Sequence, residues 1–252
     1  MLKISLTYFW VPFLTLTLVS FNLFSCDSLS YCFAQSDSRS DTPNNVQAGS
    51  LISKAKIYIE KNNFPMAVRH LNEALKKSPR QAEAYLLRGE ALDRMGLPMK
   101  ALQDLNKYVE LRPQDPEGFI QRADTNNFNS DHKAAVEDYN RALRILPNSR
   151  AALLGRGLAF TAMENYEMAI QDYNRLLLRY PRDHEAWANL GMAYHLSGNN
   201  QSAIENLLKA LEFEPDREWR IKIDRIIQQL SAAIVSEKPR KRGPTKSHRN
   251  PD

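Results

Sequence analysis

The sequence contains few of the residues from which disulfides, phosphate-binding loops and metal sites are built. Its 252 residues include only two cysteines, Cys26 and Cys32, and only nine glycines. Both cysteines precede the part of the chain that we predict to fold, so we expect no disulfide within it. The five histidines are scattered without metal-ligand spacing, and no Gly-rich phosphate loop or nucleophile elbow occurs. We therefore expect no catalytic residues, no metal and no cofactor, in a protein that is not an enzyme.

Proline, by contrast, recurs at a fixed interval of 34 residues, at Pro79, Pro113, Pro147, Pro181 and Pro215. Twelve residues before each of these prolines stands an alanine: Ala67, Ala101, Ala135, Ala169 and Ala203. A second column holds only small residues, Ala55, Gly89, Ala123, Gly157 and Gly191. Aliphatic and aromatic columns follow the same interval. The chain therefore contains five tandem repeats.

Each repeat is predicted to form two antiparallel helices joined by a short turn. In the fifth repeat, Trp187 and Leu190 belong to one stretch with the three-and-four spacing of a helical face, and Ile204 and Leu207 belong to another. Gly198 lies in the turn between them. The small residues let the helices approach closely, and the proline ends the second helix because it lacks an amide donor. One pair of helices cannot bury its own apolar face, so successive repeats must stack.

The fifth repeat also carries a recognisable motif, Trp187-x2-Leu190-Gly191-x2-Tyr194 followed by Ala203, Leu207, Ala210 and Pro215. This pattern resembles the tetratricopeptide repeat, and the resemblance covers residues 48–217. It implies an all-α fold, a right-handed α-solenoid of five helix pairs. The five repeats are expected at residues 48–81, 82–115, 116–149, 150–183 and 184–217.

A further helix is predicted to cover the open end of the last repeat. Trp219, Ile223, Ile227 and Leu230 are spaced as one apolar stripe directly after it. We expect a capping helix over residues 218–236, because a terminal repeat otherwise exposes an apolar face. An amphipathic helix on a membrane surface is the alternative interpretation.

Two charged columns predict ion pairs within the repeats. Arginine occupies one column, at Arg88, Arg122 and Arg156, and aspartate follows sixteen residues later, at Asp104, Asp138 and Asp172. Where the fifth repeat has Leu190 instead of arginine, it has Asn206 instead of aspartate. This joint loss indicates a pair between the two helices of one repeat, a structural role that we favour over ligand binding.

The amino-terminal segment predicts export or membrane attachment. Residues 4–25 carry no charge and are rich in large apolar side chains, and a polar linker over residues 35–47 separates them from the repeats. Three fates are compatible with residues 1–34: cleavage after Ala34, lipidation of Cys26 in a lipobox-like sequence, or retention as a membrane anchor. Each would place the repeats outside the compartment of synthesis, in a periplasm or lumen, or at a membrane.

The carboxy-terminal tail, residues 237–252, holds the excess positive charge. It contains six basic side chains and one acidic side chain after residue 237, with the basic set at Lys238, Arg240, Lys241, Arg242, Lys246 and Arg249. Its prolines and glycine predict a disordered segment. The tail either keeps the chain soluble or binds a polyanion such as an anionic membrane surface; export argues against nucleic acid.

The resemblance also implies where a partner binds. In the family, the first helices of the repeats line a groove that holds a peptide or a partner's helix. The groove residues expected here are Glu83, Leu86, Glu90, Asp93, Glu117, Ile120, Asp124, Leu154, Leu158, Ala188 and Met192. Their acidic members lie in the second and third repeats, and the fourth and fifth are mostly apolar. We therefore expect a partner segment that is basic at one end and apolar at the other.

Two functions remain open at this point. The chain is either an exported or membrane-anchored scaffold that binds another protein through the groove, or a membrane- or polyanion-associated protein that acts through its basic tail. In the second case the repeats would serve as a spacer or a self-assembly element.

Overall fold

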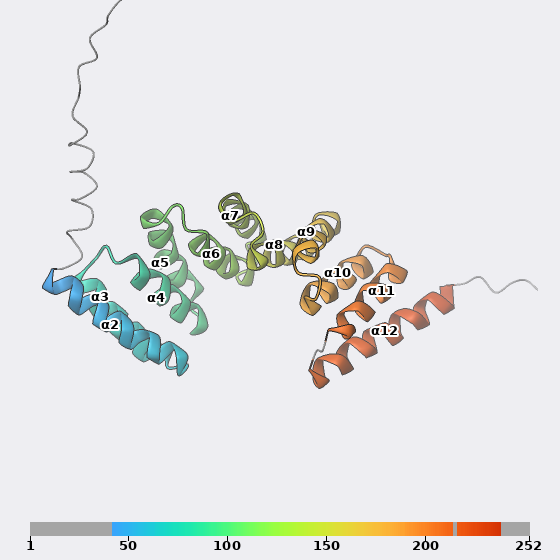
Figure 1. Cartoon of the computed structure of the whole chain (residues 1–252), viewed down its shortest axis with the longest axis horizontal. Helices are drawn as coiled ribbons and strands as arrows, with labels where there is room; N and C mark the ends of the chain where they lie inside the picture. The colour runs from blue at the N-terminus through green and yellow to red at the C-terminus, as the bar shows by residue number, and fades with distance from the viewer. Residues whose placement is uncertain (1–41, 214–215, 238–252) are drawn as a thin grey trace, which may run out of the picture. The chain divides into compact units, whose positions relative to one another are not determined.

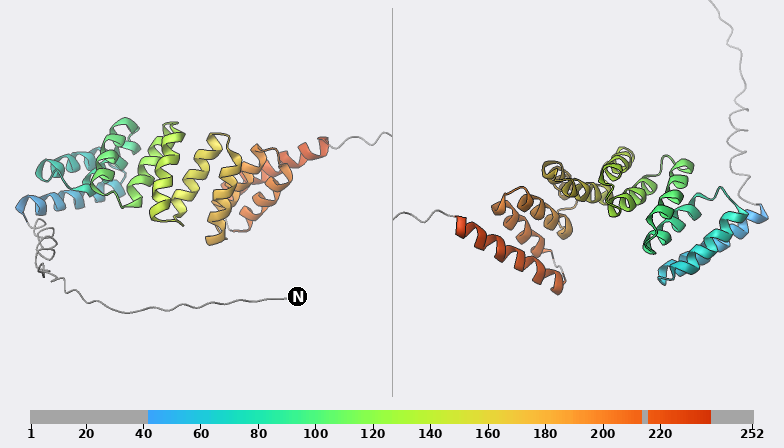
Figure 2. Two further views of the ribbon diagram at one scale, coloured as in Figure 1. Left: turned by 90° about the horizontal axis from the view of Figure 1, so that it is seen from above. Right: turned by 180° about the vertical axis from the view of Figure 1, so that it is seen from behind.

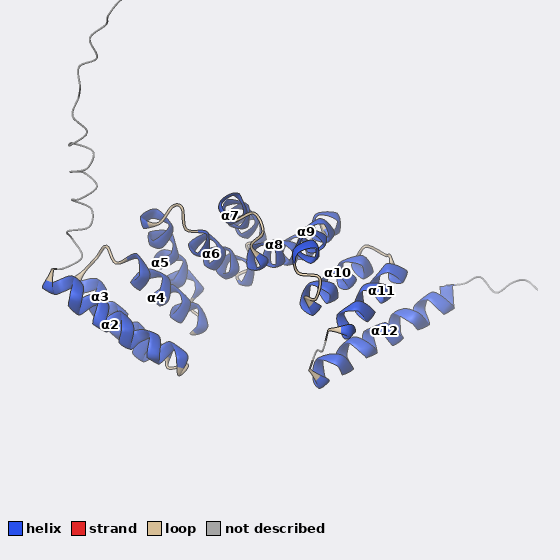
Figure 3. Cartoon of the chain, in the orientation of Figure 1, coloured by secondary structure: helices blue, strands red, loops and turns tan. Residues whose placement is uncertain are grey.

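The computed structural model describes residues 42–213 and 216–237 as an array of helices, with no strand in these ranges (Figures 1 and 3). The helices are α2 (Pro43–Glu60), α3 (Phe64–Lys77), α4 (Ala82–Arg94), α5 (Pro98–Leu111), α6 (Pro116–Phe128), α7 (His132–Ile145), α8 (Arg150–Ala162), α9 (Tyr166–Arg179), α10 (His184–Leu196), α11 (Asn200–Glu212) and α12 (Arg217–Glu237). All of them belong to the unit that begins at Pro43. The predicted all-α solenoid is confirmed.

In four of the five repeats, a polar N-cap residue precedes the second helix at the same position of the repeat. The side chains of Asn63, Asp131, Asn165 and Asn199 each accept a hydrogen bond from a backbone amide of the first turn. Such a side chain satisfies an amide that has no partner within the helix. The residue before each cap has a positive φ, as at Gly198 with φ +89°. At Gly198 the backbone adopts this conformation with little strain because glycine has no Cβ.

Each helix from α2 to α12 packs against the next helix along the chain (Figures 1 and 2). In addition, each first helix contacts the first helix of the next repeat, in the series α2, α4, α6, α8 and α10. The solenoid therefore has one row of first helices and one row of second helices. A ligand that crosses several repeats would meet the row of first helices as a continuous surface.

The small-residue columns lie where the helices approach most closely. The alanines at positions 67, 101, 135, 169 and 203 are completely buried. A Cβ atom built on Gly157 would lie 2.5 Å from the ring of Tyr173, closer than two carbon atoms can approach without one of them moving. The sequence-based role of both columns is thus confirmed.

The array begins earlier than predicted, and its last helix has the predicted bounds to within one residue at each end. Helix α2 begins at Pro43, so the last five residues of the expected linker are helical. Contacts with the end of α3 account for this extension, since Lys77 Nζ donates to Gln47 Oε1 at 2.7 Å and Ser78 donates to Asn45 at 2.7 Å. At the other end, α12 packs against α11 and buries Ile223 and Leu230 in a shared core.

Candidate functional site

The first helices bring most of the predicted groove residues to one side of the array. Glu83, Glu117, Asp124 and Leu158 are exposed, and Leu86, Glu90, Asp93 and Met192 are half-buried. They lie on α4, α6, α8 and α10, which contact one another in that order. These side chains can therefore contact one extended ligand.

Three predicted groove residues do not face solvent. Ile120 and Leu154 belong to the main core cluster, and Ala188 belongs to the cluster beneath α12; all are at most 8% exposed. Ile120 and Leu154 are enclosed where helices of successive repeats pack together, and Ala188 is enclosed with residues of α11 and α12. Their assignment as ligand contacts was wrong, which leaves Leu86, Leu158 and Met192 as the apolar groove residues that reach solvent.

Four carboxylates, Glu90, Asp93, Glu117 and Asp124, form what we call the acidic face. The charges of Glu117 and Asp93 both act on the carboxyl of Asp124, so these three groups interact. The described residues provide no ion pair for any of the four. Glu83 differs from them, because Lys56 Nζ lies 2.6 Å from its Oε1. The acidic face therefore carries negative charge that no ion pair among the described residues neutralises.

Asp124 is held in place from the adjacent helix. The hydroxyl of Tyr139, a buried side chain of α7, donates to Asp124 Oδ1. Desolvation by the surrounding protein raises the pKa of Asp124 to about 6, the Tyr139 hydrogen bond opposes that rise, and the neighbouring carboxylates add to it. Because the side chain keeps solvent contact, solvent screens part of this effect.

Asp93, one residue before the end of α4, has an incompletely satisfied carboxylate. Its Oδ1 is buried and has no hydrogen-bond donor among the described residues. Desolvation raises the pKa of this group above its usual value, although the charge of Arg94 and a side-chain hydrogen bond from Thr125 oppose the shift. A buried acceptor without a donor costs about 1–3 kcal/mol, and because this oxygen is enclosed by protein, a ligand does not reach it in this structure.

The arginine and aspartate columns form the ion pairs that the sequence predicts. Arg122 Nε and Nη2 donate to the two carboxylate oxygens of Asp138 at 2.7 and 2.6 Å. Arg88 with Asp104, and Arg156 with Asp172, repeat this bidentate geometry. Each arginine also donates from Nη1 to an asparagine of the preceding repeat, at Asn72, Asn106 and Asn140. The arginines thus connect two repeats, a contact that the sequence analysis missed.

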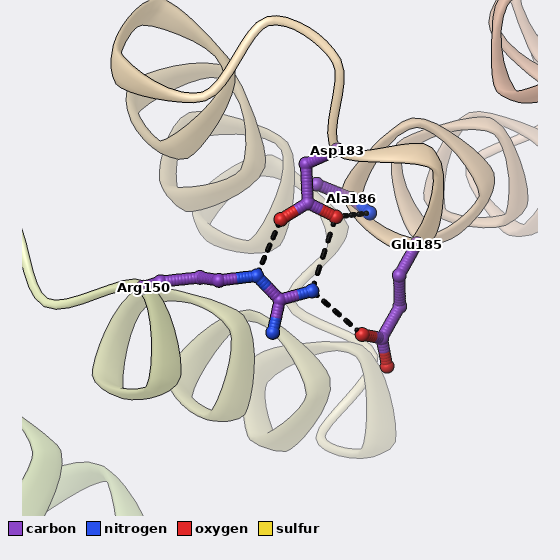
Figure 4. Close-up of polar contacts among 4 residues, drawn as sticks. All are labelled: Arg150, Asp183, Glu185 and Ala186. Carbon is purple, nitrogen blue, oxygen red and sulfur yellow. Dashed lines mark hydrogen bonds and ion pairs between the residues drawn. The ribbon is translucent and has the colours of Figure 1, made fainter. Parts of the chain in front are cut away.

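A different arginine connects the fourth and fifth repeats. Arg150, at the start of α8, donates to both carboxylate oxygens of Asp183, at 2.5 and 3.1 Å, and to Glu185 at 2.8 Å (Figure 4). Asp183 also accepts from the backbone amide of Ala186, which begins α10. Burial would raise the pKa of Asp183, but these hydrogen bonds outweigh it and lower that pKa. This contact links the two repeats where the arginine column is interrupted by Leu190.

Other predicted sites lie partly or wholly outside the described residues. The basic tail residues from Lys238 onwards, the apolar segment 4–25 and Cys26 are not described. Among the described helices, none has the length and apolar character needed to cross a membrane. The described ranges also contain no group of three or more His, Cys, Asp or Glu residues that could hold a metal ion.

Comparison with known proteins identifies the repeats. A tetratricopeptide repeat model matches residues 52–116 and 154–218, together just over half of the chain. The chain belongs to the tetratricopeptide repeat family. None of the curated proteins compared with it matches this tetratricopeptide repeat protein.

Solved structures show the same fold. The MamA protein is 26% identical over 67% of this chain and 92% of its own, with a TM-score of 0.61. YrrB, described as having an unusual peptide-binding site, is 18% identical over 78% of this chain and 98% of its own, with a TM-score of 0.59. The type IV pilus biogenesis factor PilW is 16% identical over 77% and 95%, with a TM-score of 0.64. This tetratricopeptide repeat protein therefore has the same α-solenoid fold as these structures.

The raised pKa of Asp124 predicts a pH dependence of stability. Because the pKa in the folded state, about 6, exceeds the ordinary value of 3.8, the folded chain binds more protons between these values than the unfolded chain. The contribution of Asp124 to stability should therefore fall as pH rises through this window. In melting temperatures recorded across that window, Asp124→Asn should flatten the decline, because asparagine does not ionise. Glu205→Gln removes an exposed carboxylate on α11 and should leave the decline of melting temperature with pH unchanged. If the original chain and both variants show the same dependence on pH, Asp124 does not cause the decline.

Proposed function

We propose that this chain is a non-catalytic scaffold that captures an extended segment of another protein along its row of first helices. The observation that supports this most strongly is the acidic face, whose four carboxylates have no ion-pair partner among the described residues. Lysine or arginine side chains of a partner would supply the missing positive charges. The partner segment is accordingly basic where it crosses α4 and α6.

The other end of the proposed partner segment is apolar. Leu158 on α8 is 39% exposed, and Met192 on α10 is half-buried. Methionine adapts its shape to different apolar ligands because its side chain is unbranched. With Ile120, Leu154 and Ala188 enclosed in the core, the apolar contact is smaller than the sequence alone suggested. The charged contacts therefore determine the direction in which the segment lies.

We also propose that the scaffold acts outside the compartment of synthesis or at a membrane. This proposal rests on the uncharged residues 4–25 and on the polar residues that follow them. The residue at which the mature chain begins, and the mass of any group attached at Cys26, distinguish cleavage, lipidation and retention of an anchor. The basic tail could add attraction to an anionic membrane surface, and salt-dependent vesicle binding would measure that contribution.

Reversing charges on the acidic face should abolish capture of a basic segment. We expect the double variant Glu90→Lys, Asp124→Lys to bind a fluorescein-labelled peptide, with lysines at one end and leucines at the other, at least about tenfold more weakly, since like charges repel across an interface. Fluorescence polarisation at low ionic strength measures the affinity. Because Asp124 accepts a hydrogen bond from Tyr139, the variant Glu90→Lys, Glu117→Lys repeats the test without disturbing that contact.

A matched reversal on the second helices provides the control. Glu167→Lys with Glu205→Lys changes the net charge equally but on α9 and α11, where both side chains are exposed. This variant should keep most of the affinity, and circular dichroism should show the same helicity in all chains. Undiminished peptide binding by both acidic-face variants would refute the proposed binding surface.

A further inference from the structure

The ends of α7 and α9, with the loops that follow them, carry an uncompensated positive charge. Residues 139–148 and 173–182 contain five arginines and neither aspartate nor glutamate, whereas the equivalent residues 207–216 of the fifth repeat contain three acidic side chains. All five arginines are exposed, and none forms an ion pair with a described residue. We call this set the arginine edge: Arg141, Arg144, Arg175, Arg179 and Arg182.

Two hydrogen bonds hold the loop after α7 beside α9 and the loop after it. Arg175 Nη2, on α9, donates to the backbone oxygen of Pro147 at 2.6 Å. Arg150, which follows the first loop, donates to Asp183 in the second loop at 2.5 Å (Figure 4). A shallow pocket at this junction is lined by Arg150 together with residues 179–183. The arginines of the third and fourth repeats therefore lie along one edge of the array.

Large apolar side chains are exposed on the same edge. Leu178 is 87% exposed, so it contributes little to the core. Its position holds a charged residue in each of the other four repeats: Lys76, Glu110, Arg144 and Glu212. Leu146 and Tyr180 share a second position, are 49% and 39% exposed, and have polar or charged counterparts in the other repeats. Exposed apolar side chains grouped among charged ones mark an interaction surface.

We propose that the arginine edge docks the third and fourth repeats on an anionic phospholipid membrane. A guanidinium group binds phosphate through two parallel hydrogen bonds. Tyrosine is enriched at the membrane interface, and leucine enters the boundary between head groups and acyl chains. A nucleic acid would instead be bound by stacking of its bases on aromatic rings, which the aliphatic Leu146 and Leu178 do not provide.

This docking surface goes beyond peptide capture and does not involve the acidic face. Membrane attachment through a single weak signal is marginal and reversible, and two signals together make it stable. The uncharged residues 4–25, through which we propose attachment to a membrane, would be one signal. The arginine edge would be a second signal, and it would also determine which side of the repeats faces the membrane.

A fluorescent label at position 178 tests for docking, whatever else attaches the chain to the membrane. The full chain with Cys26→Ser, Cys32→Ser and Leu178→Cys is labelled with NBD, whose emission increases in apolar surroundings, and is reconstituted into vesicles. Emission should rise severalfold when the vesicles contain phosphatidylglycerol, compared with phosphatidylcholine alone, and high salt should reduce the rise. Leu196→Cys carries the control label. It is 46% exposed at the opposite end of α10 from Asp183, so its emission should not respond.

Removing two arginines should weaken docking strongly. One basic residue near an anionic membrane strengthens binding about fivefold, so Arg144→Gln with Arg179→Gln should lower the docking equilibrium constant about 25-fold. Lys100→Gln with Lys133→Gln is the matched control, because it removes the same charge from exposed positions in the first turns of α5 and α7. This control should leave the response at position 178 unchanged, and circular dichroism should show equal helicity in all chains.

Two results would overturn the inference. One is a label at position 178 that does not respond to phosphatidylglycerol, or that responds no more than the label at position 196. The other is a response at position 178 to single-stranded DNA or polyglutamate but not to the vesicles, which would assign the edge to a different polyanion. Arg144→Gln with Arg179→Gln should bind the lysine–leucine peptide as the original chain does, so failure of membrane docking and failure of peptide capture are separate outcomes.

Discussion

Replacing Asp138 by alanine is expected to lower the free energy of unfolding by about 2–4 kcal/mol, because it leaves a largely buried arginine without its counter-ion. Asp138 accepts two hydrogen bonds from Arg122, and the two side chains are only 6% and 15% exposed. The arginine also connects α6 to the preceding repeat through Asn106. The loss should therefore weaken stacking between repeats as well as packing within one. Chemical denaturation monitored by circular dichroism measures the effect.

Asn106→Ala provides a graded comparison. It removes a single hydrogen bond to Arg122 while the bidentate pair with Asp138 remains, so we expect a cost of about 1 kcal/mol. Replacing both Arg122 and Asp138 by apolar residues should cost less than the sum of the two single substitutions, since no unpaired charge remains buried. A loss below 0.5 kcal/mol for Asp138→Ala would show that the pair contributes no more than an exposed salt bridge.

The sequence predicted this pair but not the asparagine that completes it. Arginine and aspartate vary together between repeats, so Leu190 and Asn206 revealed their relation. Asn106 carries no such signal, because it belongs to the preceding repeat and asparagine is common on exposed helical surfaces. Asn174, at the equivalent position before Leu190, remains asparagine although no arginine follows it. Covariation within one sequence therefore identified the contact inside a repeat and missed the contact between repeats.

The candidate surface was predictable to a similar extent. The repeat interval placed Glu90, Asp93 and Asp124 on first helices, and the structure brings Asp93 and Asp124 close enough to influence each other. The repeat interval could not reveal that Ile120 and Leu154 are enclosed, because their burial depends on how closely successive first helices approach. The hydrogen bond from Tyr139 to Asp124 was equally hidden, since it depends on the tilt of one aromatic ring. Periodicity determines which helix a residue occupies, and packing determines whether a ligand can reach it.

Two kinds of polar contact join the repeats. Arginines 88, 122 and 156 connect each of the second, third and fourth repeats to the repeat before it. The fifth repeat has the buried Leu190 at this position and depends on Arg150, whose contacts with Asp183 and Glu185 lie at the start of α10. This substitution moves the polar link from the middle of the first helix to its beginning. Leu190 instead joins the apolar cluster of α6 to α10, and Trp187 and Tyr194 pack both against that cluster and against the one beneath α12.

Gly155→Ala is expected to destabilise the fold by about 1–3 kcal/mol through overpacking. A Cβ atom at this position would lie 2.4 Å from both Cζ and Oη of Tyr139. The tyrosine is 1% exposed, so the ring has little room in which to move. Gly49→Ala is the matched control, because Gly49 also lies within a helix but has nothing within 4 Å of the added atom. Alanine there should stabilise the helix by about 0.5–1 kcal/mol.

A double variant tests whether the loss of stability comes from the contact between the added methyl group at position 155 and the ring of Tyr139. The column that contains Tyr139 holds leucine at positions 71, 105 and 207, so Tyr139→Leu is compatible with the repeat. Combined with Gly155→Ala, it should cost clearly less than the sum of the single substitutions, because the shorter side chain leaves space for the new methyl group. Strict additivity would mean that the two residues do not compete for space. The Tyr139 hydroxyl also donates to Asp124. Gly155→Ala alone should therefore also weaken peptide binding at the acidic face. Such a loss would link the packing of α8 to the position of a carboxylate on α6.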